Sequence, residues 1–325
     1  MAEPLRPLSI GELLDRTLSL YRQNFRLFVG VSILGPAVGL VFNLSFAGST
    51  SLNRTMVTSP FSAPGALAIV LLGLAVMMFG YALAHAAAVK AVAAVYLGRS
   101  IGVLEAYRAI KKRFWRIIGV TISVAIRVYG SLFLLVFVAA IMAALLTVAV
   151  GIFLGTVGRA PEDVMMRQIV ITTVMVVFML VALGLGAVFV ARYALAIQAC
   201  VVEDLPRKQS LKRSVLLSKG SRGRIVTIYG VFVILGLAVS IGLTAVFRTV
   251  PNILIPGLTF RLVLNQIASL IAGTLIAPLA VIAMSLVYYD ERVRKEAFDL
   301  QLMMESLDSA PSPVPVQSLP GTQPG

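Results

Sequence analysis

The chain has 325 residues, of which 59% are hydrophobic and only 13% are charged, and its mean hydropathy is +0.95. A soluble domain typically carries about 25% charged residues, and one water-soluble core could not bury so much apolar surface. These values argue against a soluble enzyme and predict an integral membrane protein. The net charge of +14 lies mainly in short segments between apolar runs, which favours anionic lipid headgroups over nucleic acid as the partner.

Six sustained apolar runs follow one another along the chain, and a helix needs about 20 such residues to cross a bilayer. A spanning segment must satisfy its own backbone hydrogen bonds, so each run is predicted to be an α-helix. The third and fourth runs exceed the length of one simple crossing and are interrupted by Arg127 and Arg192. The runs cover residues 27–47, 65–89, 117–155, 169–202, 225–247 and 262–289. The sequence therefore predicts an all-α bundle of six transmembrane helices.

The distribution of Lys and Arg predicts the orientation. The segment before the first run, the second and fourth connections and the segment after the last run carry most of the 28 basic residues. The opposite side carries only Arg54, Arg159, Arg167, Arg248 and Arg261. Short loops rich in Lys and Arg stay in the cytoplasm. We therefore expect a multipass protein of the cytoplasmic (inner) membrane with both termini in the cytoplasm.

Three basic segments precede the odd-numbered runs and resemble each other. They read SIGELLDRTLSLYRQNFRLFVGV from Ser9, SIGVLEAYRAIKKRFWRIIGV from Ser100 and QSLKRSVLLSKGSRGRIVTIYGV from Gln209. Ser9 and Glu12 have the spacing of a capping box, a helix-start signal. Basic amphipathic helices beside apolar crossings are typical of the headgroup region. We therefore predict interfacial helices over 9–22, 100–112 and 205–219, although basic segments before a crossing are also common without any repeat.

One helix followed by a transmembrane hairpin, used three times, would divide the chain into repeats at about 5–97, 98–204 and 205–300. All three belong to one membrane domain over residues 1–308. Residues 309–325 are rich in proline and show no apolar periodicity, so we expect a disordered tail there. No cleavable signal peptide is expected, because the first apolar run follows a long amphipathic stretch that contains acids.

Three stretches of the chain resemble a known family. They are SIGELLDRTLSLYRQNF, VVEDLPRKQSLKRSVLLSKG and VYYDERVRKEAFDL. They are similar to the membrane domain of bacterial glycerophosphoryl diester phosphodiesterases and related uncharacterised multipass proteins, over about residues 5–307. The resemblance implies the membrane architecture. In those enzymes a separate soluble barrel domain performs the hydrolysis, and this chain has no counterpart of that domain, so we expect no phosphodiesterase activity.

The sequence holds no constellation typical of catalysis. With one His and one Cys, Cys200, the chain cannot build a His- or Cys-rich metal site or an internal disulfide. No Walker A loop, nucleophile elbow or HExxH motif occurs, so no catalytic residue, metal or cofactor is expected. Acids do cluster near the end of the last run, but basic residues interleave with them, which predicts a solvated, salt-bridged helix. These acids are Asp290, Glu291 and Glu296.

Ionisable residues inside the apolar runs are the candidate site residues, because burying charge in a bilayer is costly. His85 is a candidate intramembrane polar site, although a packed structural histidine is the simpler interpretation. Arg127 and Arg192 lie at similar distances from the cytoplasmic ends of consecutive helices, so they are expected to be close neighbours. They could bind an anion or a lipid phosphate. Alternatively, both arginines mark the headgroup boundary and their helices project into the cytoplasm.

Two functional hypotheses remain open from the sequence. The first is a non-catalytic membrane protein that binds anionic phospholipid headgroups or organises unidentified protein partners at the cytoplasmic face. The second is a transporter or channel for a small anionic amphiphile such as a glycerophosphodiester, which internal repeats favour. A water-filled cavity lined by Arg127, Arg192 and His85 would favour the second.

The predicted orientation can be tested by cysteine accessibility in a Cys200→Ala background. Arg54→Cys and Arg159→Cys should react with an impermeant thiol reagent from outside the cell, and Lys112→Cys should react only from the cytoplasmic side. These expectations follow from the asymmetry of basic charge. The reverse labelling pattern would contradict the orientation.

Overall fold

The computed structural model describes residues 8–53, 62–156, 163–254, 258–297 and 304. Nearly all of them lie in helices, and no strand occurs among these residues. Six of the helices are long and apolar enough to cross a membrane. The predicted all-α fold is confirmed, and the chain is a multipass integral membrane protein. The proline-rich segment 309–325 lies outside the described residues.

The order of the helices follows the internal similarity of the sequence, with one or two short helices before each pair of long ones. The first group is α1 (Ile10–Gln23), α2 (Phe25–Ser32), α3 (Leu34–Asn53) and α4 (Ser62–Tyr96). The second is α5 (Val103–Lys111), α6 (Phe114–Thr156) and α7 (Asp163–Tyr193). After α8 (Ala196–Val202) come α9 (Arg207–Ser218), α10 (Arg222–Leu254) and α11 (Leu258–Glu296). The repeat boundaries themselves stay a prediction.

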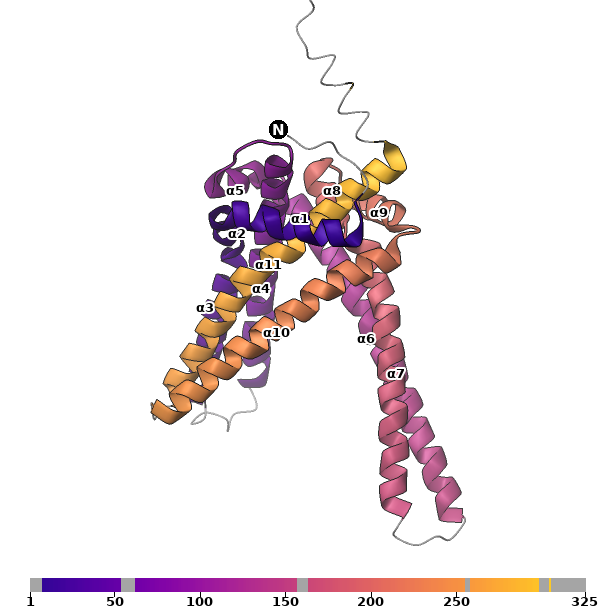
Figure 1. Ribbon diagram of the computed structural model, residues 1–325. Coiled ribbons are helices and arrows are strands. Elements are labelled where there is room, and N and C mark those ends of the chain that lie inside the picture. Colours follow the sequence, from indigo (N-terminus) through magenta and orange to yellow (C-terminus); the bar gives the residue numbers. More distant parts are fainter. Residues whose placement is uncertain (1–7, 54–61, 157–162, 255–257, 298–303, 305–325) are drawn as a thin grey trace, which may run out of the picture.

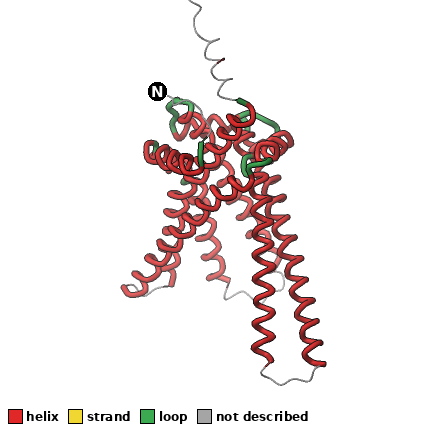
Figure 2. The backbone as a smooth tube through the Cα atoms, turned by 45° about the vertical axis from the view of Figure 1, so that its right-hand side comes forward, coloured by secondary structure: helices red, strands yellow, loops and turns green. Residues whose placement is uncertain are grey.

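The short helices α1, α5, α8 and α9 gather at one end of the molecule, which we call the basic end (Figures 1 and 2). The segments predicted over 9–22, 100–112 and 205–219 are mainly helical, although α5 begins only at Val103. The capping box predicted at the start of α1 is confirmed. Ser9 Oγ accepts a hydrogen bond from the Glu12 amide at 3.3 Å, and the Glu12 carboxylate accepts one from the Ser9 amide at 2.7 Å.

The last helix, α11, is the centre of the bundle. In its most apolar stretch 61% of the residues are buried, against 6% in α6 and in α10. It contacts α1, α2, α3, α4, α8, α9 and α10. Tyr288 and Tyr289, near its end, are among the largest fully buried side chains. The packing of the basic end therefore depends on the last turns of α11.

The hairpin of α6 and α7 diverges from the other long helices away from the basic end (Figures 1 and 2). Helix α6 is continuous over 43 residues, so Arg127 does not break it. At 1.5 Å per residue it is roughly 64 Å long, about twice the thickness of the hydrocarbon layer. Its outer side chains are open, with Phe133 71% and Leu134 61% exposed, as expected of a helix that faces lipid.

The fourth apolar run is not one helix, which differs from the sequence prediction. Helix α7 ends at Tyr193 and α8 starts at Ala196. The interruption leaves buried backbone groups that need partners. Ser214 of α9 supplies them, because its hydroxyl donates to the Arg192 carbonyl at 3.0 Å and accepts from the Leu195 amide at 3.2 Å. One hydroxyl thus closes the gap between α7 and α8.

Tyrosine hydroxyl groups attach the short helices α5 and α1 in a similar way. The Tyr107 hydroxyl of α5 donates to the Val31 carbonyl at 2.6 Å, in the last turn of α2 before the interruption at Ile33. Burial raises the pKa of Tyr107 to about 12, so the hydroxyl keeps its proton. The Tyr21 hydroxyl of α1 donates to the Leu275 carbonyl of α11 at 3.0 Å. A side-chain hydroxyl of each of the helices α1, α5 and α9 therefore donates to a backbone carbonyl of another helix.

The acids at the end of α11 are buried rather than solvated, which corrects the sequence prediction. Asp290 is only 4% exposed and Glu291 only 1%. The Asp290 carboxylate accepts from the Leu8 amide at 2.6 Å, from Arg294 at 2.8 Å and from Arg224 of α10. Arg224 and Arg294 also donate to the Leu8 carbonyl, at 2.7 and 2.6 Å. Asp290 therefore joins α11 and α10 to the residue that leads into α1.

A second ionic cluster joins α11 to α8 and α9. Glu203, which follows α8, accepts two hydrogen bonds from the Arg213 Nε and Nη2 atoms at 2.9 Å, and one from the Tyr288 hydroxyl. Arg213 also pairs with Glu296 at the end of α11. These side chains are mostly buried, and paired charges of this kind are costly to separate. The salt bridges predicted within α11 are present. The same acids also pair with arginines of the neighbouring helices α9 and α10.

The attachment of α5 can be tested with Tyr107→Phe. This change removes one hydroxyl and leaves the buried Val31 carbonyl without its donor, which should lower the free energy of unfolding by about 1–3 kcal/mol. Thermal unfolding of the purified protein in detergent measures the effect. Tyr129→Phe is the matched control, because Tyr129 is 70% exposed. Equal melting temperatures for the two variants would contradict this role of Tyr107.

Candidate anion and lipid-phosphate site

The structure brings Arg127 and Arg192 to the same aromatic ring. The guanidinium carbon of Arg127 lies 5.9 Å from the ring centroid of Tyr193, and that of Arg192 lies 5.8 Å from it. Arg127 also donates to the Ser123 carbonyl of its own helix at 2.9 Å. Both guanidinium groups therefore lie near the Tyr193 ring, in the same region of the antiparallel hairpin of α6 and α7, as expected from the sequence.

No acid neutralises these two cations within the described residues. The acids nearest to Arg192 along the chain are used elsewhere, since Glu203 pairs with Arg213 and Asp204 pairs with Arg113 and Arg116. Arg127 is exposed, whereas the Nε atom of Arg192 is buried and has no hydrogen-bond partner. Two cations without acidic partners in the same region favour an anion between or beside them. The arrangement suits a phosphate or carboxylate group.

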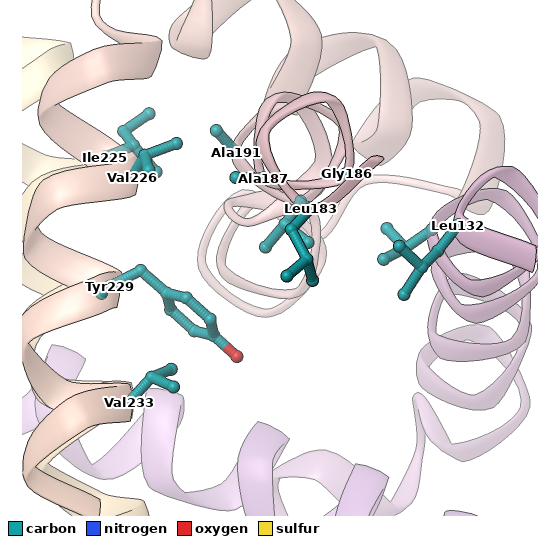
Figure 3. A pocket seen from close by; sticks show the side chains of 12 residues that line it. Leu132, Leu183, Gly186, Ala187, Ala191, Ile225, Val226, Tyr229 and Val233 are labelled. Carbon is teal, nitrogen blue, oxygen red and sulfur yellow. The ribbon is translucent and has the colours of Figure 1, made fainter. Parts of the chain in front are cut away.

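An apolar cavity of about 250 Å³ lies between α6, α7 and α10 (Figure 3), and its lining residues Val128 and Ala191 are the sequence neighbours of these arginines. Leu132 of α6, Leu183 and Ala187 of α7 and Val233 of α10 are among its walls. The side chain of Tyr229 points into it and brings its one hydroxyl (Figure 3). A wall of this composition fits hydrocarbon better than a polar solute.

Each helix around the cavity carries an arginine on the side of the basic end. Arg127 precedes the lining residue Val128, Arg192 follows the lining residue Ala191, and Arg222 lies one turn before Ile225. The Nε atom of Arg222 is buried and has no partner, as in Arg192. Sequence reasoning missed Arg222, because it counted this residue only among the basic residues of the fourth connection.

His85 is separate from this group. It lies on α4, whereas the cavity is formed by α6, α7 and α10, and His85 is not among the residues that line it. Its Nε2 atom is buried and has no hydrogen-bond partner. This cavity is therefore not the water-filled space lined by His85, Arg127 and Arg192 that would favour transport.

The short helices at the basic end expose basic and apolar side chains together. On α1, α5 and α9 an exposed leucine and an exposed basic residue are four positions apart, which places them on one helix face. Trp115, which follows the start of α6, is 80% exposed. The pairs are Leu18 and Arg22 on α1, Leu104 and Arg108 on α5, and Lys212 and Leu216 on α9. We call these faces, together with Trp115, the interfacial surface.

Comparisons of the chain with protein families, with curated proteins and with solved structures found no match. The resemblance to the membrane domain of glycerophosphoryl diester phosphodiesterases therefore stays a prediction from the three quoted stretches.

Proposed function

We propose that this integral membrane protein is not an enzyme and that its basic end binds the headgroups of anionic phospholipids. The basic end would face the cytoplasm, with both termini on that side of the inner membrane. The observation that supports this function best is the interfacial surface, where an exposed leucine and an exposed basic residue share one face on each of the helices α1, α5 and α9.

A helix face that exposes both a leucine and a basic residue suits the boundary between the hydrocarbon and the headgroups of a bilayer. There the leucine enters hydrocarbon, while the long basic side chain extends to the phosphate layer. Tryptophan also favours this boundary, and Trp115 lies at the start of a long apolar helix. The three short helices would then lie in the headgroup layer around the bundle.

The charge of the basic end supports anionic rather than neutral lipid. Many of its basic side chains are exposed and form no ion pair among the described residues. Each such residue near a membrane surface contributes about 1 kcal/mol to the attraction for anionic lipid. These residues are Arg22, Arg26, Arg99, Arg108, Lys111, Lys112, Arg207, Lys208, Lys212 and Lys219.

The transporter hypothesis has less support. A transported anion needs a polar path through the bilayer, whereas the cavity beside the arginines is apolar and excludes His85. An organising role for protein partners is compatible with headgroup binding, because both would use the same exposed face. The chemistry of that face nevertheless matches lipid more directly than protein.

Trp115 is the only tryptophan in the chain, so its fluorescence reports the lipid around the interfacial surface. The protein would be reconstituted in two bilayers of identical composition, with bromine on the chains of phosphatidylglycerol in one and of phosphatidylcholine in the other. We expect stronger quenching by brominated phosphatidylglycerol, because the neighbouring cations enrich anionic lipid.

The triple variant Arg108→Gln, Lys111→Gln, Lys112→Gln should remove that difference. A matched control, Arg54→Gln, Arg159→Gln, Arg248→Gln, changes the net charge equally on the predicted opposite side and should preserve it. Equal quenching by the two lipids in the unmodified protein would overturn the proposed headgroup binding.

A further inference from the structure

We propose that the cavity between α6, α7 and α10 binds one acyl chain of an anionic glycerophospholipid, with the lipid phosphate held by Arg127 and Arg192. This inference specifies a single lipid site and rests on the proposed binding of anionic lipid at the basic end. It differs from that function in place and in stoichiometry, because the interfacial surface attracts many lipids and the cavity holds one.

The walls of the cavity have the depth and composition for an acyl chain. On α10 they extend from Ile225 to Val233, roughly 12 Å at 1.5 Å per residue, which is close to the hydrocarbon depth of one leaflet. Leu183 is 53% and Val233 41% exposed although both line the cavity. The cavity is therefore open to the outside of the bundle, beside the apolar stretches of α7 and α10.

The arginines select a phosphate at the end of that cavity. Arg127 and Arg192 approach the same Tyr193 ring and have no acidic partner among the described residues. Arg192 and Arg222 each have a buried Nε–H group without an acceptor. An unpaired donor of a charged group is costly to bury, and a phosphate oxygen would relieve this cost.

The groups along the cavity suit the two parts of a phospholipid. Arg222 lies one turn before the lining residue Ile225, and Tyr229, with its hydroxyl, lies among apolar lining residues on both sides of it (Figure 3). A phosphate would meet the arginines at the basic end, hydrocarbon would meet the apolar walls, and the Tyr229 hydroxyl is a donor for an ester carbonyl. A free glycerophosphodiester would leave the apolar walls empty.

The chain offers a matched pair of glycines to test the cavity. Gly230 lines it, and a Cβ atom at this position would contact nothing within 4 Å, so Gly230→Leu fills the cavity without a clash at its first atom. Gly242 lies on the same helix with equally open space and does not line the cavity. Gly242→Leu therefore controls for a leucine on the surface of α10.

Delipidated protein in detergent would be mixed with dioleoyl phosphatidylglycerol, and bound lipid counted by native mass spectrometry. We expect one retained molecule in the unmodified protein and in Gly242→Leu, and at least about tenfold lower occupancy in Gly230→Leu. Dioleoylglycerol has the same chains without the phosphate and should bind at least about tenfold more weakly, since contacts to charged groups are worth that much. Glycerophosphoglycerol, which lacks chains, should not compete.

The double variant Arg127→Gln, Arg192→Gln gives an independent test that leaves the cavity open. It should lose the preference for phosphatidylglycerol over dioleoylglycerol. Unchanged occupancy in Gly230→Leu, equal binding of dioleoylglycerol, competition by glycerophosphoglycerol, or an unchanged preference in the double variant would each overturn the inference. Quenching of Trp115 by brominated phosphatidylglycerol should persist in Gly230→Leu, so failure of the cavity site is distinguishable from failure of headgroup binding at the interfacial surface.

Discussion

The arrangement of the basic end depends on the hydrogen bonds and ion pairs of the buried Asp290 carboxylate. This carboxylate is held in the last turns of the most buried helix, and it binds the Leu8 amide together with Arg224 of α10 and Arg294 of α11. Leu8 has both its amide and its carbonyl engaged, so the chain enters α1 in one position. A buried charge with this many partners stabilises one geometry, because any other would leave a charge unpaired in an apolar setting.

The position of the candidate lipid site follows from the same anchor. Arg224 fixes the first turn of α10 to α11, and that turn carries Arg222 and leads into the lining residue Ile225. The other wall is fixed by Ser214, which binds the Arg192 carbonyl at the end of α7. The walls are thus held firmly near the arginines and diverge away from them. The cavity lies next to these anchored helix ends. Its own walls are almost entirely apolar, because the polar contacts that hold the helices lie outside it.

Much of the fold could be predicted from the sequence, because bilayer thickness and backbone hydrogen bonding leave few choices for long apolar runs. The capping box at Ser9 and the placement of Arg127 and Arg192 in the same region of the α6–α7 hairpin also followed from local spacing. The burial of Asp290 could not be predicted, since its pairing with Arg294 looks like a surface i,i+4 pair and Arg224 is distant in sequence. The gap between α7 and α8 could not be predicted, because the groups that it exposes are bound by Ser214 of α9. A helix whose buried face consists largely of serines gives no apolar pattern that would show this contact. The cavity was invisible, because it arises from the divergence of helices rather than from any motif.

Amide hydrogen exchange of Asp290→Asn, in bilayer nanodiscs, tests most directly whether this carboxylate organises the basic end. The substitution keeps the size of the side chain and removes the charge that Arg224 and Arg294 share. We predict that the amides of α1 lose protection, since the two arginines that bind the Leu8 carbonyl lose the charge that holds them in place, while the amides in the middle of α6 exchange as in the unmodified protein. Unchanged protection of α1 would contradict the account, because the position of α1 would then not depend on Asp290.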